Sequence, residues 1–555
     1  MKLILRFTFL LLLFVTNNSW AQDYNIAQKY FTIPIVKQKS FVSLVRLKIN
    51  ATGKDSLNNY LTQIKVTTKG SSNPSDILSI KAYCNTDSNY LVEDRVFQNA
   101  FFSSTEKSNG DSDTLQLNGN LRLNPSNNFI WVGVVLNPSS EIGNKIELSV
   151  INAEINNHNI LVPFQKIMQP SRIATAVRMF MQDNVNTSRI PGIATAKNGD
   201  LIATFDARYN SGRDLQGDID IALCRSVDKG NTWLPIQKVI DMGTWGGLPE
   251  KFNGVSDASI LVDDKTGNIF IAGLWMHGLL DDNGKWIDGL TDTSKVWNHQ
   301  WRNKGSQPGF EPNQTAQFLL VKSVDNGKTW STPVNITKMC KKEEWWLYAP
   351  APGRGFTLDN GILVFPTQGR DKEGKPFSNI TYSKDGGKTW ETSEPASNDS
   401  TNECAGVQLS DGTIMLNMRT IANKGLVGVG NGRTVVTTAD LGKTWKVHPT
   451  SRNALPEPVC MASLYKHQYL KNGKKQSVLL FVNPSSTVSR NHITLKASFD
   501  EGNTWPSDKY ILLDELNGAG YSCITSIDND TIGIIYEGSQ AQLIFQKINL
   551  KQITE

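Results

Sequence analysis

Cysteine and histidine are both scarce in this chain of 555 residues, which contains six of each. The cysteines are scattered without a CxxC pair, at Cys84, Cys224, Cys340, Cys404, Cys460 and Cys523. This pattern excludes a disulfide-dense small fold and predicts buried thiols, with one or two disulfides at most. No spacing typical of metal ligands occurs, so we expect neither a metal nor another cofactor in the chemistry.

An excess of one charge sign is also missing. Lys and Arg number 57 against 52 Asp and Glu, which gives a net charge of +5 at pH 7. This balance favours neither nucleic acid nor a membrane surface as a partner. No apolar run after the first 21 residues is long enough to span a bilayer, so we expect no membrane span. We expect the chain to act as a monomer.

The start of the chain differs in composition from the rest. Lys2 and Arg6 precede the apolar run "FTFLLLLFV", and the small-residue segment "SWA" follows it. This order predicts a signal peptide over residues 1–21, with cleavage before Gln22. We therefore expect a soluble, exported protein that is periplasmic, displayed on the cell surface or secreted.

One short turn motif recurs five times. Asp can bond to the backbone of its own turn, Gly supplies a positive φ, and the Thr and Trp that follow suit a strand. We call this motif the Asp box; its copies are "SVDKGNTW" at Ser226, "SVDNGKTW" at Ser323, "SKDGGKTW" at Ser383, "TADLGKTW" at Thr438 and "SFDEGNTW" at Ser498.

Six hairpin patterns alternate with these boxes. Their turns are rich in Gly, Asn or Asp, as in "IATAKNGDLIATFDAR" and "VQLSDGTIMLNMR". A hairpin followed by a strand pair with an Asp box makes one four-stranded sheet, and repeats of about 60 residues predict an all-β, six-bladed β-propeller over residues 173–555. Residues 22–169 lack both repeats and alternate as in "FVSLVRLKIN", which predicts a β-sandwich. For this domain, carbohydrate binding and a spacer or packing role are both open.

The order of strands in a blade predicts which residues meet. Strand 1 starts, and strand 2 ends, at the blade end opposite the Asp box. The boxes are therefore expected to be structural fasteners. The polar residues expected at the other end are Arg189, Arg208, Asp214, Asp257, Arg354, Gln368, Glu403, Arg419, Arg490, Tyr521 and Glu537, together with Trp275. Because arginine suits bidentate binding of a carboxylate or phosphate, this cluster predicts an anionic small ligand.

At this level the sequence resembles a known family. "RIP" before the first hairpin, the repeated Asp boxes and "GYSC" before the last hairpin are similar to bacterial exo-α-sialidases (neuraminidases). "DARYNS", "NMR", "LPEPVCMASL" and "HITLKAS" further resemble the sialidases of Bacteroides-like bacteria. The resemblance covers about 173–555, and the preceding domain resembles the non-catalytic N-terminal domain of that group. Ser188 departs from the pattern, because an aromatic residue commonly precedes "RIP".

The resemblance implies a role for each matching residue. Arg189, Arg419 and Arg490 match the triad that binds the substrate carboxylate. Tyr521 matches the nucleophile and Glu403 the base that takes its proton. Asp214 matches the general acid/base, with Asp218 and Asp220 as rivals in the same loop.

Other residues match positions around the sugar. Arg208 and Asp257 match contacts with polar substituents around O4, with a structural ion pair as the alternative for each. Gln317 and Gln368 are candidate contacts with the glycerol tail. An N-acetyl methyl or an aglycone needs an apolar surface; the candidates, for which blade packing is the alternative, are Trp275, Met276, Trp286, Trp297 and Trp301.

The resemblance therefore implies a retaining exo-α-sialidase that releases terminal sialic acid from glycoproteins, glycolipids and oligosaccharides, so its partners are sialylated glycans. A trans-sialidase or intramolecular trans-sialidase would use the same site. A catalytically inactive sialic-acid-binding propeller is the alternative from another class. The presence of Tyr521, Glu403 and Asp214 together argues against the inactive protein.

Overall fold

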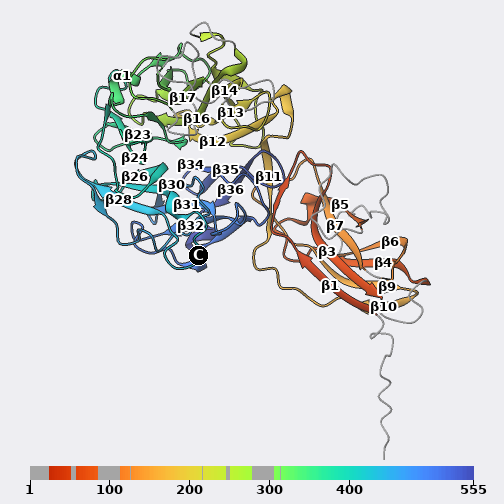
Figure 1. Cartoon of the computed structure of the whole chain (residues 1–555). Helices are drawn as coiled ribbons and strands as arrows, with labels where there is room; N and C mark the ends of the chain where they lie inside the picture. The colour runs from red at the N-terminus through yellow and green to blue at the C-terminus, as the bar shows by residue number, and fades with distance from the viewer. Residues whose placement is uncertain are drawn as a thin grey trace, which may run out of the picture. The chain divides into compact units, whose positions relative to one another are not determined.

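The computed structural model describes residues 24–51, 58–85, 113–125, 127–215, 217–245, 250–277, 306–312 and 314–555 (Figure 1). The predicted all-β class is confirmed, because strands dominate and helices are limited to single turns. The predicted signal peptide, 1–21, lies outside the described residues. No helix in the described ranges is both long enough and apolar enough to cross a membrane.

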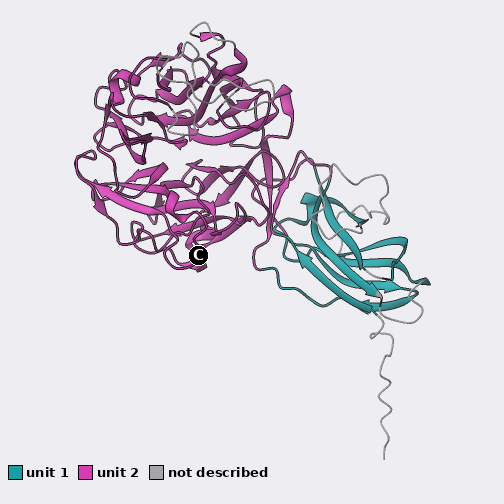
Figure 2. Cartoon of the chain, in the orientation of Figure 1, with its two compact units in different colours: residues 1–31, 41–137, 147–167 teal, residues 32–40, 138–146, 168–555 magenta. Residues whose placement is uncertain are grey.

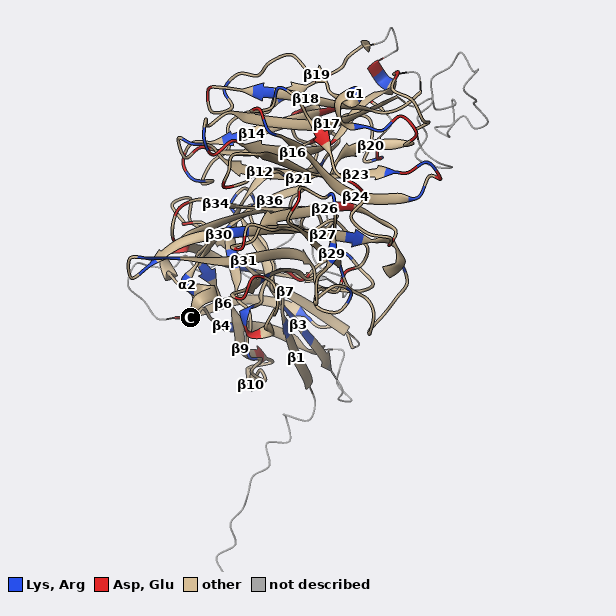
Figure 3. Ribbon diagram, turned by 90° about the vertical axis from the view of Figure 1, so that its left-hand side faces the viewer, with Lys and Arg blue, Asp and Glu red and all other residues tan. Residues whose placement is uncertain are grey.

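The chain divides into two compact units (Figure 2). Unit 1 comprises 1–31, 41–137 and 147–167, and unit 2 comprises 32–40, 138–146 and 168–555. Two short segments from within the range expected for the first domain thus belong to unit 2. Lys and Arg are interspersed with Asp and Glu along the strands and loops of both units (Figure 3), as the small net charge leads one to expect.

Unit 1 contains two four-stranded antiparallel sheets. The first has the order β1 (Tyr24–Tyr30), β3 (Val42–Ala51), β7 (Asn127–Leu136), β5 (Ile77–Asn85). The second has the order β10 (His158–Leu161), β9 (Ser149–Ile155), β4 (Tyr60–Thr67), β6 (Thr114–Arg122). Along β4, buried Leu61, Ile64 and Val66 are separated by residues that retain exposure, so this strand turns one face toward an apolar core.

Unit 2 is built from four-stranded antiparallel meanders that follow one another along the chain. The first three are β12 (Thr187–Thr195), β13 (Leu201–Arg208), β14 (Ile219–Ser226), β15 (Gln237–Ile240); β16 (Asn253–Val262), β17 (Ile269–His277), β18 (Gln317–Ser323), β19 (Val334–Asn335); and β20 (Leu347–Pro350) with β22 (Phe356–Thr357), β23 (Leu363–Arg370), β24 (Pro376–Ser383), β25 (Glu391–Thr392). The short strand β21 (Gly353–Arg354) pairs in parallel with β16.

The remaining meanders lie in the C-terminal part of the chain. They are β26 (Thr401–Gln408), β27 (Ile414–Thr420), β28 (Thr434–Thr438), β29 (Lys446–Val447); β30 (Ser463–Lys471), β31 (Lys474–Pro484), β32 (Ile493–Ser498), β33 (Ile511–Asp514); and β34 (Ser522–Ser526), β35 (Thr531–Tyr536), β36 (Leu543–Asn549). The α-helices are α1 (Thr337–Cys340) and α2 (Lys551–Thr554), and the 3-10 turns are η3 (Pro74–Asp76), η5 (Gln182–Asn184), η7 (Glu250–Phe252), η8 (Ile421–Asn423) and η9 (Ser507–Lys509).

The last meander takes its fourth strand from the other end of unit 2. Strand β11 (Ser171–Arg178) pairs antiparallel with β36, with Thr175 opposite Phe545. On its outer side β11 pairs with β2 (Pro34–Val36) and β8 (Lys145–Ile146). This meander has no Asp box because no turn joins its third strand to its fourth. Pairing the two ends of unit 2 in one sheet closes the series of meanders.

Each Asp box forms the turn between the third and fourth strands of a meander. In all five, one carboxylate oxygen accepts from the Thr hydroxyl at 2.6–2.7 Å. The Ser or Thr that opens the box accepts from the Gly N–H at 2.7–2.9 Å. These aspartates are therefore bonded within their own turns.

The glycine of the box also brings neighbouring meanders together. Gly230 and Gly387 both have φ of +87°, which disfavours any side chain. A Cβ on Gly230 would lie 2.1 Å from Phe545 of the last meander, and one on Gly387 would lie 2.7 Å from Phe270 of the second. The Trp of the first box also contacts the last meander, because the Trp233 indole N–H donates to Thr175 of β11 at 3.2 Å. The motif is thus a fastener within a turn and between sheets.

All six cysteines are free thiols. Cys84 is half-buried and the other five are buried. Burial raises the pKa of the Cys224 thiol to about 11, so this thiol is unreactive at neutral pH.

Asp325→Ala is expected to lower the free energy of unfolding by about 1–2 kcal/mol, because it removes the acceptor for Thr329 and for two backbone N–H groups. Thermal melts at pH 7 measure this effect. Hydrogen bonds lower the pKa of Asp325, so its contribution is complete above about pH 4 and is lost as the pH falls further. The difference in Tm between wild type and variant should therefore shrink on acidification; a constant difference would contradict this account.

Candidate active site

Five of the predicted residues come from the expected ends of four meanders. Arg189 lies near the start of β12, Glu403 near the start of β26 and Arg419 near the end of β27. Tyr521 immediately precedes β34, and Arg490 lies between β31 and β32. Strand order therefore brings together residues separated by more than 300 positions in the sequence.

Tyr521, Glu403 and Arg419 form a triangle of direct contacts. The Tyr521 hydroxyl donates to Glu403 Oε1 at 2.5 Å. Arg419 Nη1 donates to the other oxygen of Glu403 and, at 3.0 Å, to the Tyr521 Oη. Tyr521 and Glu403 are 6% and 5% exposed, so the phenol and its acceptor are largely shielded from water.

The other two arginines flank the Tyr521 ring. The guanidinium carbons of Arg189 and Arg490 each lie 5.5 Å from the ring centroid. Arg490 donates to the carbonyls of Ala519 at 3.0 Å and Val459 at 3.4 Å. No carboxylate among the described residues pairs with Arg490, so its positive charge is available to an anion.

Burial and neighbouring charges set the protonation of the tyrosine. Burial, followed by the Glu403 charge, raises the pKa of Tyr521 well above its usual value, while Arg419 and Arg490 act in the opposite direction. The resting residue is therefore a neutral phenol whose proton already points at a carboxylate.

Glu537, which strand order placed at this end of the meanders, contacts three groups of the site. It is buried and accepts from Arg189 Nε at 2.6 Å, from the Ile190 N–H at 2.8 Å and from the Tyr521 N–H at 3.0 Å. Burial raises the pKa of Glu537, but the Arg189 charge and these bonds outweigh it and leave the pKa lowered. The sequence indicates this location, because Glu537 directly follows the second strand of the last hairpin.

A second cluster surrounds Arg208, which is buried at the end of β13. Its Nη2 donates to Asp206 Oδ2 at 2.9 Å and to Asp214 Oδ1 at 2.8 Å. The Asp214 side chain is 64% exposed, whereas Asp206 is fully buried. Of the three acids in the loop, Asp214 is thus the one held by a candidate site residue. Asp220 instead pairs with Lys238 at 2.7 Å, and Asp218 forms no ion pair with another described residue.

Asp257 of β16 and Gln368 of β23 bring the second and third meanders into contact. Gln368 Nε2 donates to Asp257 Oδ2 at 2.9 Å. Burial, followed by the charges of Glu403, Asp214 and Asp206, raises the pKa of Asp257 well above its usual value. The mutual effect of these carboxylates connects the Arg208 cluster with the Tyr521 cluster in one electrostatic site.

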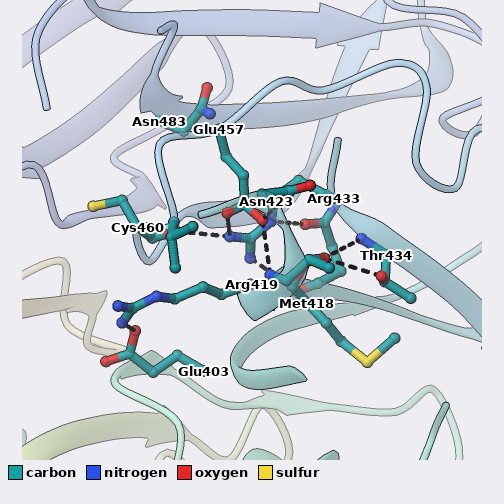
Figure 4. A network of polar contacts seen from close by, with 12 residues as sticks. Glu403, Met418, Arg419, Asn423, Arg433, Thr434, Glu457, Cys460 and Asn483 are labelled. Atoms are coloured by element: carbon teal, nitrogen blue, oxygen red, sulfur yellow. Dashed lines mark hydrogen bonds and ion pairs between the residues drawn. The ribbon is translucent and has the colours of Figure 1, made fainter. Parts of the chain in front are cut away.

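A buried ion pair lies next to the strand end that carries Arg419 (Figure 4). Arg433 Nη1 donates to Glu457 Oε2 at 2.6 Å and to the Cys460 carbonyl at 2.7 Å. Glu457 Oε1 in turn accepts from the Thr420 N–H at 2.8 Å. Arg433 and Glu457 are 0% and 1% exposed, so this pair fixes the backbone next to Arg419. Glu457 belongs to the stretch "LPEPVCMASL", to which the sequence assigned no role.

Several predicted residues lie elsewhere. Gln317 is fully buried: it donates to the Thr315 carbonyl at 2.7 Å and accepts from Asn335 at 2.8 Å, so it joins strands and has no exposed surface for a ligand. Arg354, expected at the same end as Tyr521, instead lies 4.5 Å from the Tyr465 ring in a separate cavity of about 480 Å³. The first strand of the third meander begins at Leu347, opposite Arg370, and Arg354 lies in the interruption between β20 and β22, well beyond the start of the strand.

Two of the five apolar candidates lie in the core, and the other three are not described. Trp275 and Met276 are 0% and 2% exposed and pack in the core, which supports the packing alternative. Trp286, Trp297 and Trp301 lie outside the described residues.

An all-β chain with recurrent Asp boxes and a tyrosine held between a glutamate and three arginines defines a glycoside hydrolase of the BNR-repeat class. Residues 190–509 match the family model described as BNR repeat-like domain, and residues 22–159 match the N-terminal domain of BNR-repeat neuraminidase. The chain belongs to the family of BNR-repeat sialidases, or neuraminidases.

Individual relatives agree with this assignment. A sialidase of Bacteroides fragilis (strain YCH46) is 40% identical over 438 residues, which cover 79% of this chain and 76% of that protein. A sialidase of Micromonospora viridifaciens is 30% identical over 63% of this chain and 49% of its own length. The structure of Hadza microbial sialidase Hz136 matches with a TM-score of 0.81 and 34% identity, covering 95% of this chain and all of that one.

Glu457→Gln is expected to lower the free energy of unfolding by about 3–5 kcal/mol, because it leaves the Arg433 charge buried without a counter-ion. Urea denaturation measures this change. Glu394→Gln is the matched control, since the Glu394–Lys342 pair is solvent-exposed and is worth about 1 kcal/mol or less. Equal effects of the two substitutions would show that the buried pair contributes no more than a surface pair.

Proposed function

We propose that this protein is a retaining exo-α-sialidase that hydrolyses terminal α-linked sialic acids through a covalent intermediate on Tyr521. The observation that carries the proposal is the hydrogen bond from the Tyr521 hydroxyl to Glu403, with Arg419 donating to both. The anomeric carbon of a sialoside bears its own carboxylate, which would repel an attacking Asp or Glu. A neutral phenol with an adjacent base avoids this repulsion.

Arg189, Arg419 and Arg490 bind the substrate carboxylate in this proposal. Arg490 supports it most directly, because within the described ranges its guanidinium bonds to carbonyls and pairs with no carboxylate. Arg189 and Arg419 already carry Glu537 and Glu403 as counter-ions and contribute their remaining N–H groups. Arg208, Asp257 and Gln368 then face the polar substituents of the sugar.

The first step forms the bond between Tyr521 Oη and the anomeric carbon as the glycosidic C–O bond breaks. Glu403 takes the phenol proton, and Asp214 gives its proton to the departing oxygen. In the second step Asp214 removes a proton from water, whose oxygen attacks the anomeric carbon. The Tyr521 oxygen leaves and recovers its proton from Glu403. Two displacements at one carbon return the starting configuration.

The proposal extends to the architecture and location of the protein. We read the meanders of unit 2 as the blades of a six-bladed β-propeller, with the blade formed by β34, β35, β36 and β11 closing the ring. The two sheets of unit 1 form a β-sandwich, and residues 1–21 direct export. Alternating buried and exposed positions along β4 and the antiparallel sheet orders support this architecture.

Arg490→Lys keeps the charge but loses the planar fork. We expect kcat/KM for sialosides to fall by about 2–4 kcal/mol in transition-state stabilisation, or roughly 30- to 800-fold, as for a lost charged contact. Steady-state kinetics on a fluorogenic sialoside measure this loss. Lys322→Arg, at the half-buried position of the otherwise buried strand β18, should leave kcat/KM unchanged. An Arg490→Lys enzyme with full activity would remove Arg490 from the carboxylate site.

Tyr521→Phe and Asp214→Ala should differ in their dependence on the leaving group. Asp214→Ala should impair cleavage of sialyl-galactosides strongly and spare much of the first step on aryl sialosides, whose phenol leaves without protonation. Tyr521→Phe should impair both. A 3-fluorosialosyl fluoride should label the wild-type protein on the peptide containing "GAGYSC", and peptide mass spectrometry locates the adduct.

Each alternative has its own signature in these assays. An adduct on Glu403 would reverse the roles of nucleophile and base. Transfer to an added sugar acceptor in preference to water would identify a trans-sialidase. Binding of sialosides without turnover by the wild-type protein would identify an inactive, lectin-like propeller.

A further inference from the structure

Asp206 is a fully buried carboxylate that none of the roles above uses. It lies in β13, two residues before Arg208, and has no exposed surface. A buried charge is retained in a fold only where partners compensate its desolvation, so its contacts indicate what it does.

Both oxygens of Asp206 bond to groups of the proposed site. Oδ2 accepts from Arg208 Nη2 at 2.9 Å and from the Ser256 hydroxyl at 2.6 Å. Oδ1 accepts from the backbone N–H of Asp257 at 3.2 Å. One side chain of the first meander thereby holds two residues of the second.

The contact with Asp257 bears on its backbone conformation. Asp257 has φ of +60°, the left-handed region that residues other than glycine adopt at a cost. The bond from its N–H to Asp206 stabilises that conformation and so directs the Asp257 carboxylate towards Gln368.

The contact between Asp206 and Arg208 changes the electrostatic environment of Asp214. Arg208 Nη2 donates to Asp206 and Asp214 together. If Asp206 were neutral, the guanidinium would be balanced by Asp214 alone and would hold it as a carboxylate. An acid catalyst must instead keep its proton until the glycosidic bond breaks.

We propose that Asp206 is a positioning residue that neutralises Arg208 so that Asp214 can serve as the proton donor, while it fixes the backbone of Asp257. The inference rests on the role proposed above for Asp214. The charged groups that act on this cluster are Arg208 and Asp214 from the first meander, Asp257 from the second, Glu403 from the fourth, and Arg189 beside Arg208.

The ionisation of Asp206 is compatible with this role. Burial raises its pKa to about 6, while Arg208 and Ser256 act in the opposite direction. At neutral pH the side chain is therefore mostly a carboxylate and can balance the guanidinium.

Asp206→Asn tests the inference, because it preserves shape and removes the charge. We expect kcat/KM for a sialyl-galactoside to fall at least 30-fold and that for an aryl sialoside less than 5-fold. The basic limb of the pH–kcat/KM profile on the natural substrate should move to lower pH by about one unit, because an unbalanced Arg208 stabilises the Asp214 carboxylate. Equal losses on both substrates, or an unmoved basic limb, would overturn the proposal.

Two further variants make the result specific. Asp220→Asn, in the same meander but paired with Lys238, is the matched control and should leave both the substrate ratio and the pH profile unchanged. If Asp206→Asn does not fold, Ser256→Ala removes one donor to Asp206 and should move the basic limb in the same direction by a smaller amount. A folded Ser256→Ala enzyme with the wild-type profile would likewise overturn the proposal.

The outcome separates this inference from the proposed function. If Asp214→Ala shows the leaving-group dependence and Asp206→Asn does not, Asp214 is the acid and Asp206 has no part in its protonation. If Asp214→Ala lacks that dependence, the role of Asp214 itself is wrong.

Discussion

Pairing each buried arginine with its own carboxylate is the constraint on which this site depends. Guanidinium groups gathered in a poorly solvated space repel one another and lose hydration, so each needs a compensating charge. Arg189 has Glu537, Arg208 has Asp206, Arg419 has Glu403 and Arg433 has Glu457. Among the described residues Arg490 alone in this group bonds to carbonyls instead. The site thus holds one uncompensated cation beside a buried tyrosine, which is what an anionic substrate requires.

The fold supplies these pairs from distant parts of the chain. Glu537 follows the second strand of the last meander and contacts Arg189 of the first, 348 positions away. That contact depends on β11, which joins the beginning of unit 2 to β36. The Asp boxes act at the opposite turns, where their glycines allow neighbouring sheets to approach closely. The Asp boxes and the candidate site therefore occupy different ends of the same strands.

Much of the candidate site could be predicted from strand order. Arg189, Glu403, Arg419, Arg490 and Tyr521 meet as expected, because a meander returns its chain to the same end after every second strand. Arg354 was wrong for a local reason, and Gln317 is buried among strand contacts. The first strand of the third meander begins at Leu347, so Arg354 lies within its interruption and not at its start. The amide of Gln317 is bonded between Thr315 and Asn335. Residue types alone do not tell where a strand is interrupted. They also do not tell which neighbours the side chain of Gln317 contacts.

The sequence by itself determined the all-β class, the turns and the residue types available for chemistry, because turn chemistry and strand alternation are local properties. It also determined the family, through motifs that keep their order along the chain. Only the tertiary structure decided which carboxylate balances which arginine. Glu457 and Asp206 look like ordinary acids in the sequence, and Glu537 could be placed at the site but not assigned to Arg189. The roles of all three come from burial and from partners up to several hundred residues away. Charge compensation acts through space over a few ångströms, and distance along the chain does not encode it.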